Sequence, residues 1–201
     1  MKNSLLTGIV FVVFLLSACG TSTGGGSSLF QEGIAVFINN NYAFYDTVTS
    51  ATNSSNYSEI YLARDKSIDE VTAELQDFEQ PEKIGERQED KQVLVYDDQF
   101  VILTDDEEYE GSTLIEVANT EFVRNNYNPS FFQGMLLMSF LNNMFGSNDW
   151  DRNQQAKCQQ NPNNCYGGFS RSGGGYKGYT TPPSVRGGSS SVRGGGPGAG
   201  K

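Results

Sequence analysis

The stretch Gln92–Thr104, QVLVYDDQFVILT, predicts the centre of a β-sheet. Two runs rich in Val, Leu, Ile and Phe flank Asp97-Asp98-Gln99, and this pattern is typical of a β-hairpin. Ser58–Arg64 alternates between two faces and predicts another strand, while Thr113–Ala118 continues the hairpin as a third strand. The sequence therefore predicts a small, mostly antiparallel sheet that consists of a meander plus one further strand.

Helices are expected between and after these strands. Ser67 followed by Glu70 forms a capping box, and the apolar residues after it recur at helical spacing as far as Phe78. Further helices are predicted at 30–38, 120–126 and 131–145. We expect the helices to pack on one face of the sheet, which makes a small α+β domain.

The N-terminus has the pattern of a secretory signal. Lys2 precedes an apolar run at 5–16, and the run ends in Leu16-Ser17-Ala18-Cys19. This ending resembles the bacterial lipobox, in which the Cys thiol receives a diacylglyceryl group and becomes the new N-terminus. We therefore expect a signal peptide at 1–18, acyl chains such as palmitate on Cys19, and a location on the extracytoplasmic face of the cell membrane. A plain signal peptide and an uncleaved anchor are the alternatives.

Charge and composition divide the rest of the chain. Residues 19–28 read as a flexible Gly/Ser spacer after the lipidated Cys, and 29–146 as an acidic α+β domain. All 24 Asp and Glu lie between Glu32 and Asp151 with six basic residues, a net charge of −18. Residues 147–201 are expected to be a basic, Gly/Ser/Arg-rich, disordered tail, because few aliphatic side chains offset the entropy of ordering it.

The basic tail is a candidate contact for anionic polymer or lipid headgroups of the cell envelope. The residues expected to make this contact are Arg171, Lys177, Arg186 and Arg193. Arg-Gly-Gly repeats with aromatic residues nearby resemble RNA-binding tails, but an exported protein rarely meets RNA, so no nucleic acid partner is expected. A passive tail, and a tail attracted to its own acidic domain, remain open alternatives.

The residue types present restrict the chemistry. The chain has no His, which excludes Ser-His-Asp triads, Cys-His pairs and His-ligated metals. Cys158 and Cys165 form either a disulfide or two free thiols, and the sequence leaves both possibilities open. The acidic segment 105–111 lacks EF-hand spacing and reads as a solvated turn. We expect no catalytic residue, no metal and no cofactor.

Several strings together resemble a lipoprotein family of Gram-positive bacteria that is classed as a domain of unknown function. The strings are Tyr45-Asp46-Thr47-Val48, Glu59 to Val71, Val93-Leu94-Val95-Tyr96-Asp97-Asp98, and Thr113-Leu114-Ile115-Glu116-Val117 running on to Phe132. The resemblance covers about 29–145 and leaves the tail outside. The resemblance implies lipid anchoring. It implies no enzymatic activity, because the family has no established one.

These observations favour a lipid-anchored, non-catalytic protein of the bacterial cell envelope. Its expected partners are the membrane, through the anchor, and either another envelope protein or an anionic envelope polymer. The alternative is a small lipoprotein that binds a solute or a cation. An enzyme is disfavoured by the missing His.

Overall fold

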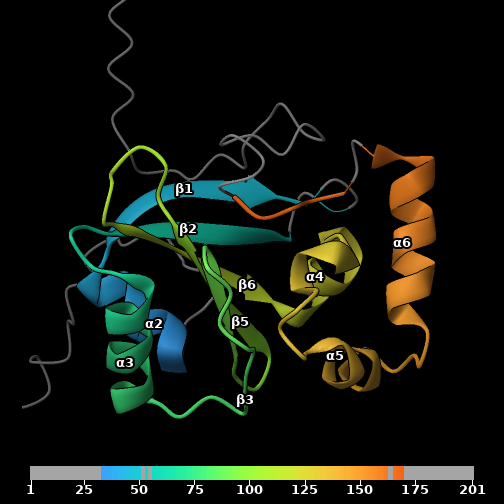
Figure 1. The fold of residues 1–201 in the computed structure, drawn as a ribbon, viewed down its shortest axis with the longest axis horizontal. Helices are drawn as coiled ribbons and strands as arrows, with labels where there is room; N and C mark the ends of the chain where they lie inside the picture. The colour runs from blue at the N-terminus through green and yellow to red at the C-terminus, as the bar shows by residue number, and fades with distance from the viewer. Residues whose placement is uncertain (1–32, 51–52, 54–55, 163–164, 170–201) are drawn as a thin grey trace, which may run out of the picture. The chain divides into compact units, whose positions relative to one another are not determined.

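The computed structural model describes residues 33–50, 53, 56–162 and 165–169. It contains a six-stranded antiparallel sheet in the order β1-β2-β6-β5-β4-β3, with helices packed on it (Figure 1). The strands are β1 (Ala43–Thr49), β2 (Tyr57–Ala63), β3 (Lys83–Ile84), β4 (Lys91–Val95), β5 (Gln99–Asp105) and β6 (Thr113–Asn119). The predicted α+β class is confirmed.

The connections follow the predicted meander. β3, β4, β5 and β6 are consecutive antiparallel neighbours, and β6 then lies beside β2. The helix α3 (Ile68–Phe78) carries the chain from β2 to β3. Two strands were not predicted from the sequence: β1, an edge strand that is mostly exposed, and β3, which has only two residues.

Helices cover both faces of the sheet, so the prediction of a single covered face is wrong. Residues Phe100 and Ile102 of β5 point into one core, and Val101 and Leu103 point into the other. β5 is buried on both sides, which explains why its sequence is continuously apolar instead of alternating. Figure 1 shows α2 (Gly33–Asn41) with α3 on one side and α4 (Thr120–Asn126) with α5 (Met138–Met144) on the other.

The capping box predicted at the start of α3 is present. The Ser67 hydroxyl accepts a hydrogen bond from the Glu70 amide at 3.3 Å, and the Glu70 carboxylate accepts one from the Ser67 amide at 2.8 Å. Both bonds satisfy donors that a helix start leaves without partners. The buried face of α3 then packs on the sheet through Ile68, Val71 and Leu75.

The long helix predicted at 131–145 is broken in the structure. A 3₁₀ helix, η2 (Pro129–Phe132), comes first, and α5 begins only at Met138. Between them Gly134 and Leu136 have φ angles of +82° and +53°, which a right-handed helix does not contain. The apolar spacing misled the prediction because Phe131, Phe132 and residues of α5 reach the same core without a continuous helix.

The folded part also extends beyond the expected boundary at 147. The helix α6 (Trp150–Gln160) buries Trp150, Gln154 and Cys158, which recur every fourth residue in an otherwise polar segment. After α6, Tyr166 and Phe169 belong to the core that α4 and α5 cover. The prediction ended the domain too early because these few buried side chains are separated by polar residues and Gly, so no continuous apolar run marks the segment.

Several predicted residues lie outside the described part of the chain. These are the signal segment 1–18, Cys19, the spacer, and the basic residues Arg171, Lys177, Arg186 and Arg193. Among the residues that the structure describes, no helix has the length and apolar character needed to cross a membrane.

Candidate functional site

The most unusual side chain in the core is Glu116, in the middle of β6. It is 3 % exposed, and its neighbours on the same face of the strand, Leu114 and Ala118, belong to the core beneath α4 and α5. A charged carboxylate in such a place is unfavourable unless hydrogen bonds compensate for the lost water.

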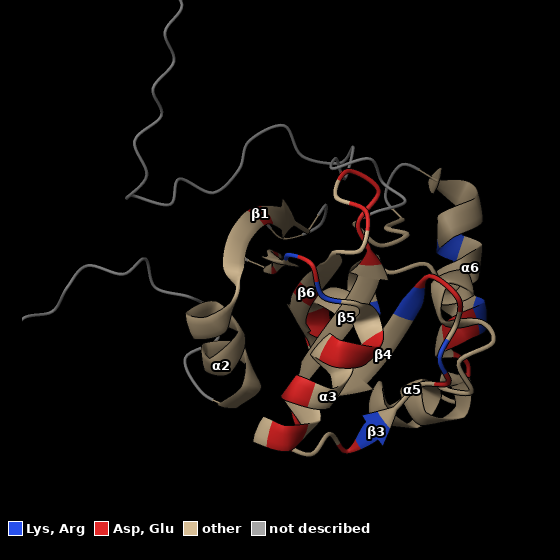
Figure 2. Ribbon diagram, turned by 60° about the vertical axis from the view of Figure 1, so that its left-hand side comes forward, with Lys and Arg blue, Asp and Glu red and all other residues tan. Residues whose placement is uncertain are grey.

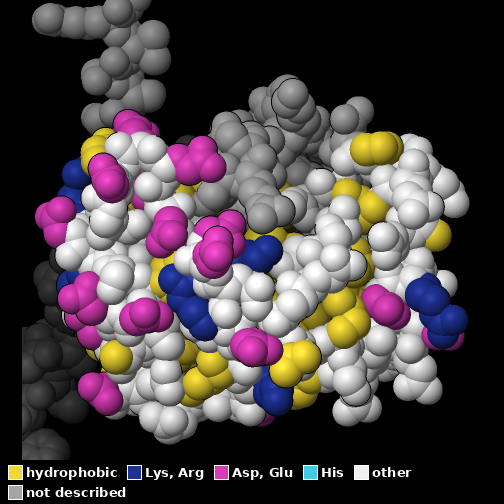
Figure 3. All heavy atoms as spheres, in the orientation of Figure 1, with side chains coloured by type: hydrophobic (Ala, Val, Ile, Leu, Met, Phe, Trp, Pro, Cys, Tyr) yellow, Lys and Arg dark blue, Asp and Glu magenta, His cyan; other side chains and the backbone are white. Residues whose placement is uncertain are grey.

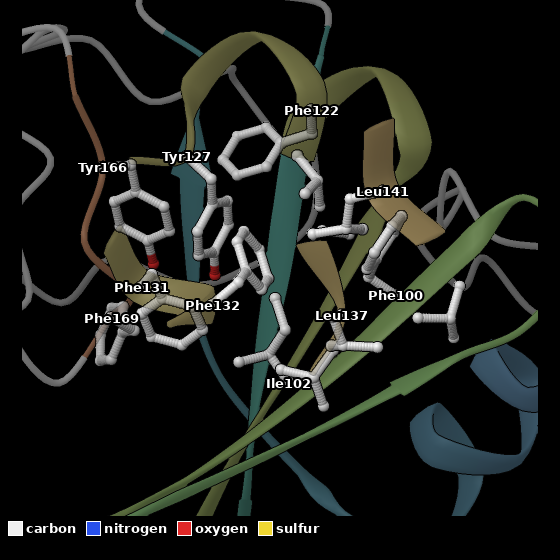
Figure 4. Packing of buried hydrophobic residues seen from close by; sticks show 14 of the residues in the cluster. Phe100, Ile102, Phe122, Tyr127, Phe131, Phe132, Leu137, Leu141, Tyr166 and Phe169 are labelled. Atoms are coloured by element: carbon white, nitrogen blue, oxygen red, sulfur yellow. The ribbon is translucent and has the colours of Figure 1, made fainter. Parts of the chain in front are cut away.

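Four donors surround the Glu116 carboxylate. The Ser58 hydroxyl donates to Oε1 at 2.7 Å, and the hydroxyls of Tyr127 and Tyr166 donate to Oε2 at 2.8 and 2.9 Å. The backbone N–H of Phe169 is the fourth donor. Figure 4 shows the Tyr127 and Tyr166 rings close together with their hydroxyls pointing the same way. The carboxylate therefore joins β2, β6, the end of α4 and the C-terminal part of the described chain.

Burial and hydrogen bonding act on this carboxyl in opposite directions. Burial raises the pKa of Glu116 to about 7, and the four hydrogen bonds limit the rise because they stabilise the charged form. The pKa of Tyr127 is raised well above its ordinary value, first by burial and then by the nearby Glu116 charge. The Tyr127 hydroxyl therefore stays protonated and remains a donor at neutral pH.

We name residues 165–169 the strap. Its main chain pairs with the end of α4 and the residues just after it. The Tyr166 amide donates to the Asn126 carbonyl, and the Asn128 amide donates to the Tyr166 carbonyl, both at 2.8 Å. Tyr127 and Tyr166 are opposite each other in this short parallel bridge. The strap is therefore held by an isolated bridge outside the sheet, and this bridge brings the Tyr166 side chain to Glu116.

A disulfide fastens the start of the strap to α6. Cys158 and Cys165 are bonded, with their Cα atoms 5.4 Å apart. The helix itself is attached to the end of α4, because Trp150 Nε1 donates to the Arg124 carbonyl at 2.9 Å and Gln154 Nε2 donates to the Asn125 carbonyl at 3.1 Å. The strap is thus connected covalently to an element that is already fixed on the domain.

The other end of the strap needs a glycine. Gly168 has a φ angle of +93°, and a Cβ atom at this position would lie 2.7 Å from Cε2 of Phe131. This close approach sets the Phe169 ring 5.8 Å from the ring of Tyr45, in an edge-to-face contact. The Tyr45 hydroxyl in turn donates to Glu108 in the turn between β5 and β6 at 3.1 Å.

A cavity of about 320 Å³ lies beside the strap. Its lining consists of Asp90, Lys91, Thr104, Asp105, Glu107, Phe131, Gly167 and Gly168. Lys91 is only 6 % exposed, and its ammonium lies 4.6 Å from the centre of the Phe131 ring, a cation–π contact. Carboxylates next to a buried ammonium could hold a small solute with a positively charged group.

Acidic side chains are unevenly distributed over the described surface. They run along the turn between β5 and β6 in Figure 2, and they gather over the half of the molecule that carries α2 and α3 in Figure 3. Within the described ranges, no three Asp, Glu or Cys side chains are grouped so that they could hold a metal ion. This surface is therefore suited to repel anions and to attract a positively charged segment.

The arrangement around Glu116 supports a structural role. The carboxyl is sealed from water in the folded state, so a substrate cannot reach it without an opening of the strap. Sequence reasoning missed this group. The sequence feature that could have indicated a buried carboxyl is a Glu between Leu114 and Ala118 on the inward-facing side of an apolar strand. Nothing in the sequence indicated that Tyr127 and Tyr166 donate to it.

Comparison with curated proteins and with solved structures found no match in either set. Comparison with protein-family models matched residues 12–197. The match is longer than the 29–145 over which the resemblance was expected, so it includes α6, the strap and most of the basic segment. The chain belongs to the family described as "Domain of unknown function (DUF4247)".

Proposed function

We propose that this protein is a lipid-anchored, extracytoplasmic component of the bacterial cell envelope, of the Gram-positive type, with a binding or structural role and no catalysis. Cys19 carries the acyl chains and ties the acidic domain to the membrane surface. The basic segment after the strap contacts anionic polymer, lipid headgroups or another envelope protein.

The observation that supports this proposal is the placement of the three cysteines in the chain. One follows the lipobox-like Leu16-Ser17-Ala18, and the other two are joined by a disulfide between α6 and the strap. Disulfides persist mainly outside the reducing cytosol, so the bonded pair supports an exported location independently of the N-terminal pattern.

The charge distribution supports a binding role. Residues 32–151 carry a net charge of −18, and the chain from Arg152 onward has seven basic residues and no acidic one. Arg152 and Lys157 lie in α6, and the other five follow the strap, which fixes on the core of the domain the point at which that basic segment begins. A tethered positive segment next to a negative body can attract anions while the body keeps the protein soluble.

The absence of catalysis is inferred from the residue types. The sequence has no His, and the one carboxyl of the described residues whose pKa rises to near neutrality, Glu116, is buried under the strap. General acid–base catalysis requires contact between such a group and the reacting atoms.

The anchor is tested by substitution of Cys19. Cys19→Ser is expected to move the protein from the membrane fraction to the soluble fraction or to leave it unprocessed, and to abolish incorporation of labelled palmitate. Cys158→Ser is the matched control, because it also replaces a cysteine with serine and leaves the lipobox-like site intact. Equal labelling of wild type and Cys19→Ser would refute the anchor.

A second candidate function is the binding of a small solute, and the cavity beside the strap favours it. Its volume of about 320 Å³ is at the lower end of ligand sites, and its lining combines three carboxylates with Lys91. A thermal-shift panel of small cationic metabolites tests it, because a ligand of the native state raises the melting temperature. A shift that Asp105→Asn and Glu107→Gln abolish would favour solute binding.

A further inference from the structure

We propose that the strap is a redox latch: it is undocked while Cys158 and Cys165 are thiols and is closed on the domain by their disulfide after export. The proposal rests on the export that the proposed function includes. It adds an oxidation of Cys158 and Cys165 after export, which neither lipid anchoring nor binding by the basic segment requires.

The geometry makes the strap separable from the rest of the fold. Every strand of the sheet is paired with another strand, and the strap takes no part in the sheet. Its main chain makes two backbone hydrogen bonds, to Asn126 at the end of α4 and to Asn128 after it, and it follows all six strands in the sequence. The domain can therefore complete its sheet before the strap docks.

The bond between Cys158 and Cys165 decides how firmly the strap is held. Cys158 is buried on α6, whose position is fixed by the hydrogen bonds of Trp150 and Gln154. The two cysteines are seven positions apart, and a covalent link between them lowers the conformational entropy of the undocked strap, which favours docking. Cys165 is partly exposed, so a thiol or a disulfide from outside can reach this end of the bond.

The closing step is a thiol–disulfide exchange. The thiolate of Cys165 attacks the disulfide of an exported dithiol–disulfide oxidoreductase, and one sulfur of that oxidant leaves as a thiolate. The thiolate of Cys158 then attacks Cys165 in the mixed disulfide and releases the second sulfur. Two electrons pass to the oxidant, which leaves as a dithiol, and the two protons come from the cysteine thiols.

Opening of the strap changes the core. Glu116 loses two of its four donors, the Tyr166 hydroxyl and the Phe169 amide, and keeps those of Ser58 and Tyr127. The aromatic face that Tyr166 covers, formed by Phe122 and Tyr127, becomes exposed. Phe169, after which the basic segment begins, is then no longer fixed to the core. The latch thus couples the oxidation state of the cysteines to the position of Phe169.

The test is amide hydrogen exchange of the full chain in detergent, oxidised and after reduction with a phosphine. The amides of Tyr166 and Asn128 form the hydrogen bonds between the strap and the end of α4. We expect these two amides to exchange at least tenfold faster after reduction. The amides of Val71 and Glu79, which bond within α3 on the opposite face of the sheet, serve as internal controls and should keep their protection. The Cys158→Ser/Cys165→Ser variant should match the reduced chain without added reductant.

Two outcomes would overturn the latch. Unchanged protection of Tyr166 and Asn128 after reduction would mean that the noncovalent contacts alone hold the strap. Loss of protection in α3 as well would mean that the disulfide is needed by the whole domain. Export is judged separately, by labelling at Cys19, so a failure of the latch and a failure of the anchor are distinguishable.

Discussion

Tyr166 donates a hydrogen bond from its hydroxyl to Oε2 of Glu116 at 2.9 Å, across fifty positions of sequence. The bond ties the strap to the centre of the sheet. Since both side chains are buried, the bond forms where water cannot replace it. This relationship has direct consequences for stability.

Removal of the Tyr166 hydroxyl should weaken the domain. Tyr166→Phe keeps the ring contacts and deletes one donor to a buried carboxylate, which is expected to cost about 1.5–3 kcal/mol in the free energy of unfolding. Tyr109→Phe is the matched control, because it removes a hydroxyl from the turn between β5 and β6, and should cost less than about 0.5 kcal/mol. Urea unfolding of both variants measures the difference, and equal costs would contradict the role assigned to Tyr166.

Stability should depend on the protonation of Glu116. Its pKa is about 7 in the folded state, above the ordinary value of 4.5. The folded state therefore binds this proton more tightly than the unfolded state does. The stabilisation that protonated Glu116 gives is complete below about pH 4.5 and is lost as the pH rises to about 7. The free energy of unfolding should fall by on the order of 3 kcal/mol over this range, at about 1.4 kcal/mol for each pKa unit.

The variant Glu116→Gln isolates this contribution. Its neutral amide has nearly the same shape and does not titrate, so the difference in unfolding free energy between wild type and variant should change between pH 4.5 and pH 7. Other carboxylates contribute equally to both proteins. A difference that stays constant over this range would show that Glu116 titrates normally.

The close contact at Gly168 gives a steric prediction. Gly168→Ala places a methyl group 2.7 Å from Phe131 and adds strain at a φ of +93°. Gly146→Ala is the control, because it adds a methyl group at a φ of +68° where no atom lies within 4 Å. It should lower the free energy of unfolding by the backbone strain alone, about 1–2 kcal/mol. We expect Gly168→Ala to cost about 1–3 kcal/mol more than the control in chemical unfolding. Similar costs would mean that the strap can move away from Phe131.

The capping box gives a prediction on the other face of the sheet. Ser67→Ala removes the hydroxyl that accepts from the Glu70 amide, and should cost about 1 kcal/mol. Ser139→Ala, at an exposed position of α5, is the control and should change stability by less than about 0.5 kcal/mol. Thermal unfolding of the two variants compares them. A neutral Ser67→Ala would mean that solvent replaces the cap.

Much of the fold could be predicted from local patterns. The hairpin around Asp97-Asp98-Gln99, the strand at β6 and the capped helix α3 were all recognisable, because alternation, turn residues and caps are properties of neighbouring residues. The long apolar helix at 131–145 was wrong since periodicity does not register the positive φ angles of Gly134 and Leu136. α6 was missed because only every fourth residue is buried in a polar segment.

The site around Glu116 could not be predicted for a different reason. The contacts of Glu116 with Ser58, Tyr127 and Tyr166 join segments that are between 11 and 58 residues apart. Hydroxyl groups are common in strands and loops, and no local pattern marks the three that converge. Only the strand register of β2 and β6 brings Ser58 to the carboxylate.

The most direct test of the account is intact-mass and peptide analysis of the protein isolated from cells. We predict a chain that begins at Cys19, carries acyl chains on that residue, and contains Cys158 linked to Cys165. These three features belong together, because lipidation and disulfide formation both require export. A chain that begins elsewhere, with an unmodified N-terminus and both cysteines present as free thiols, would contradict the account.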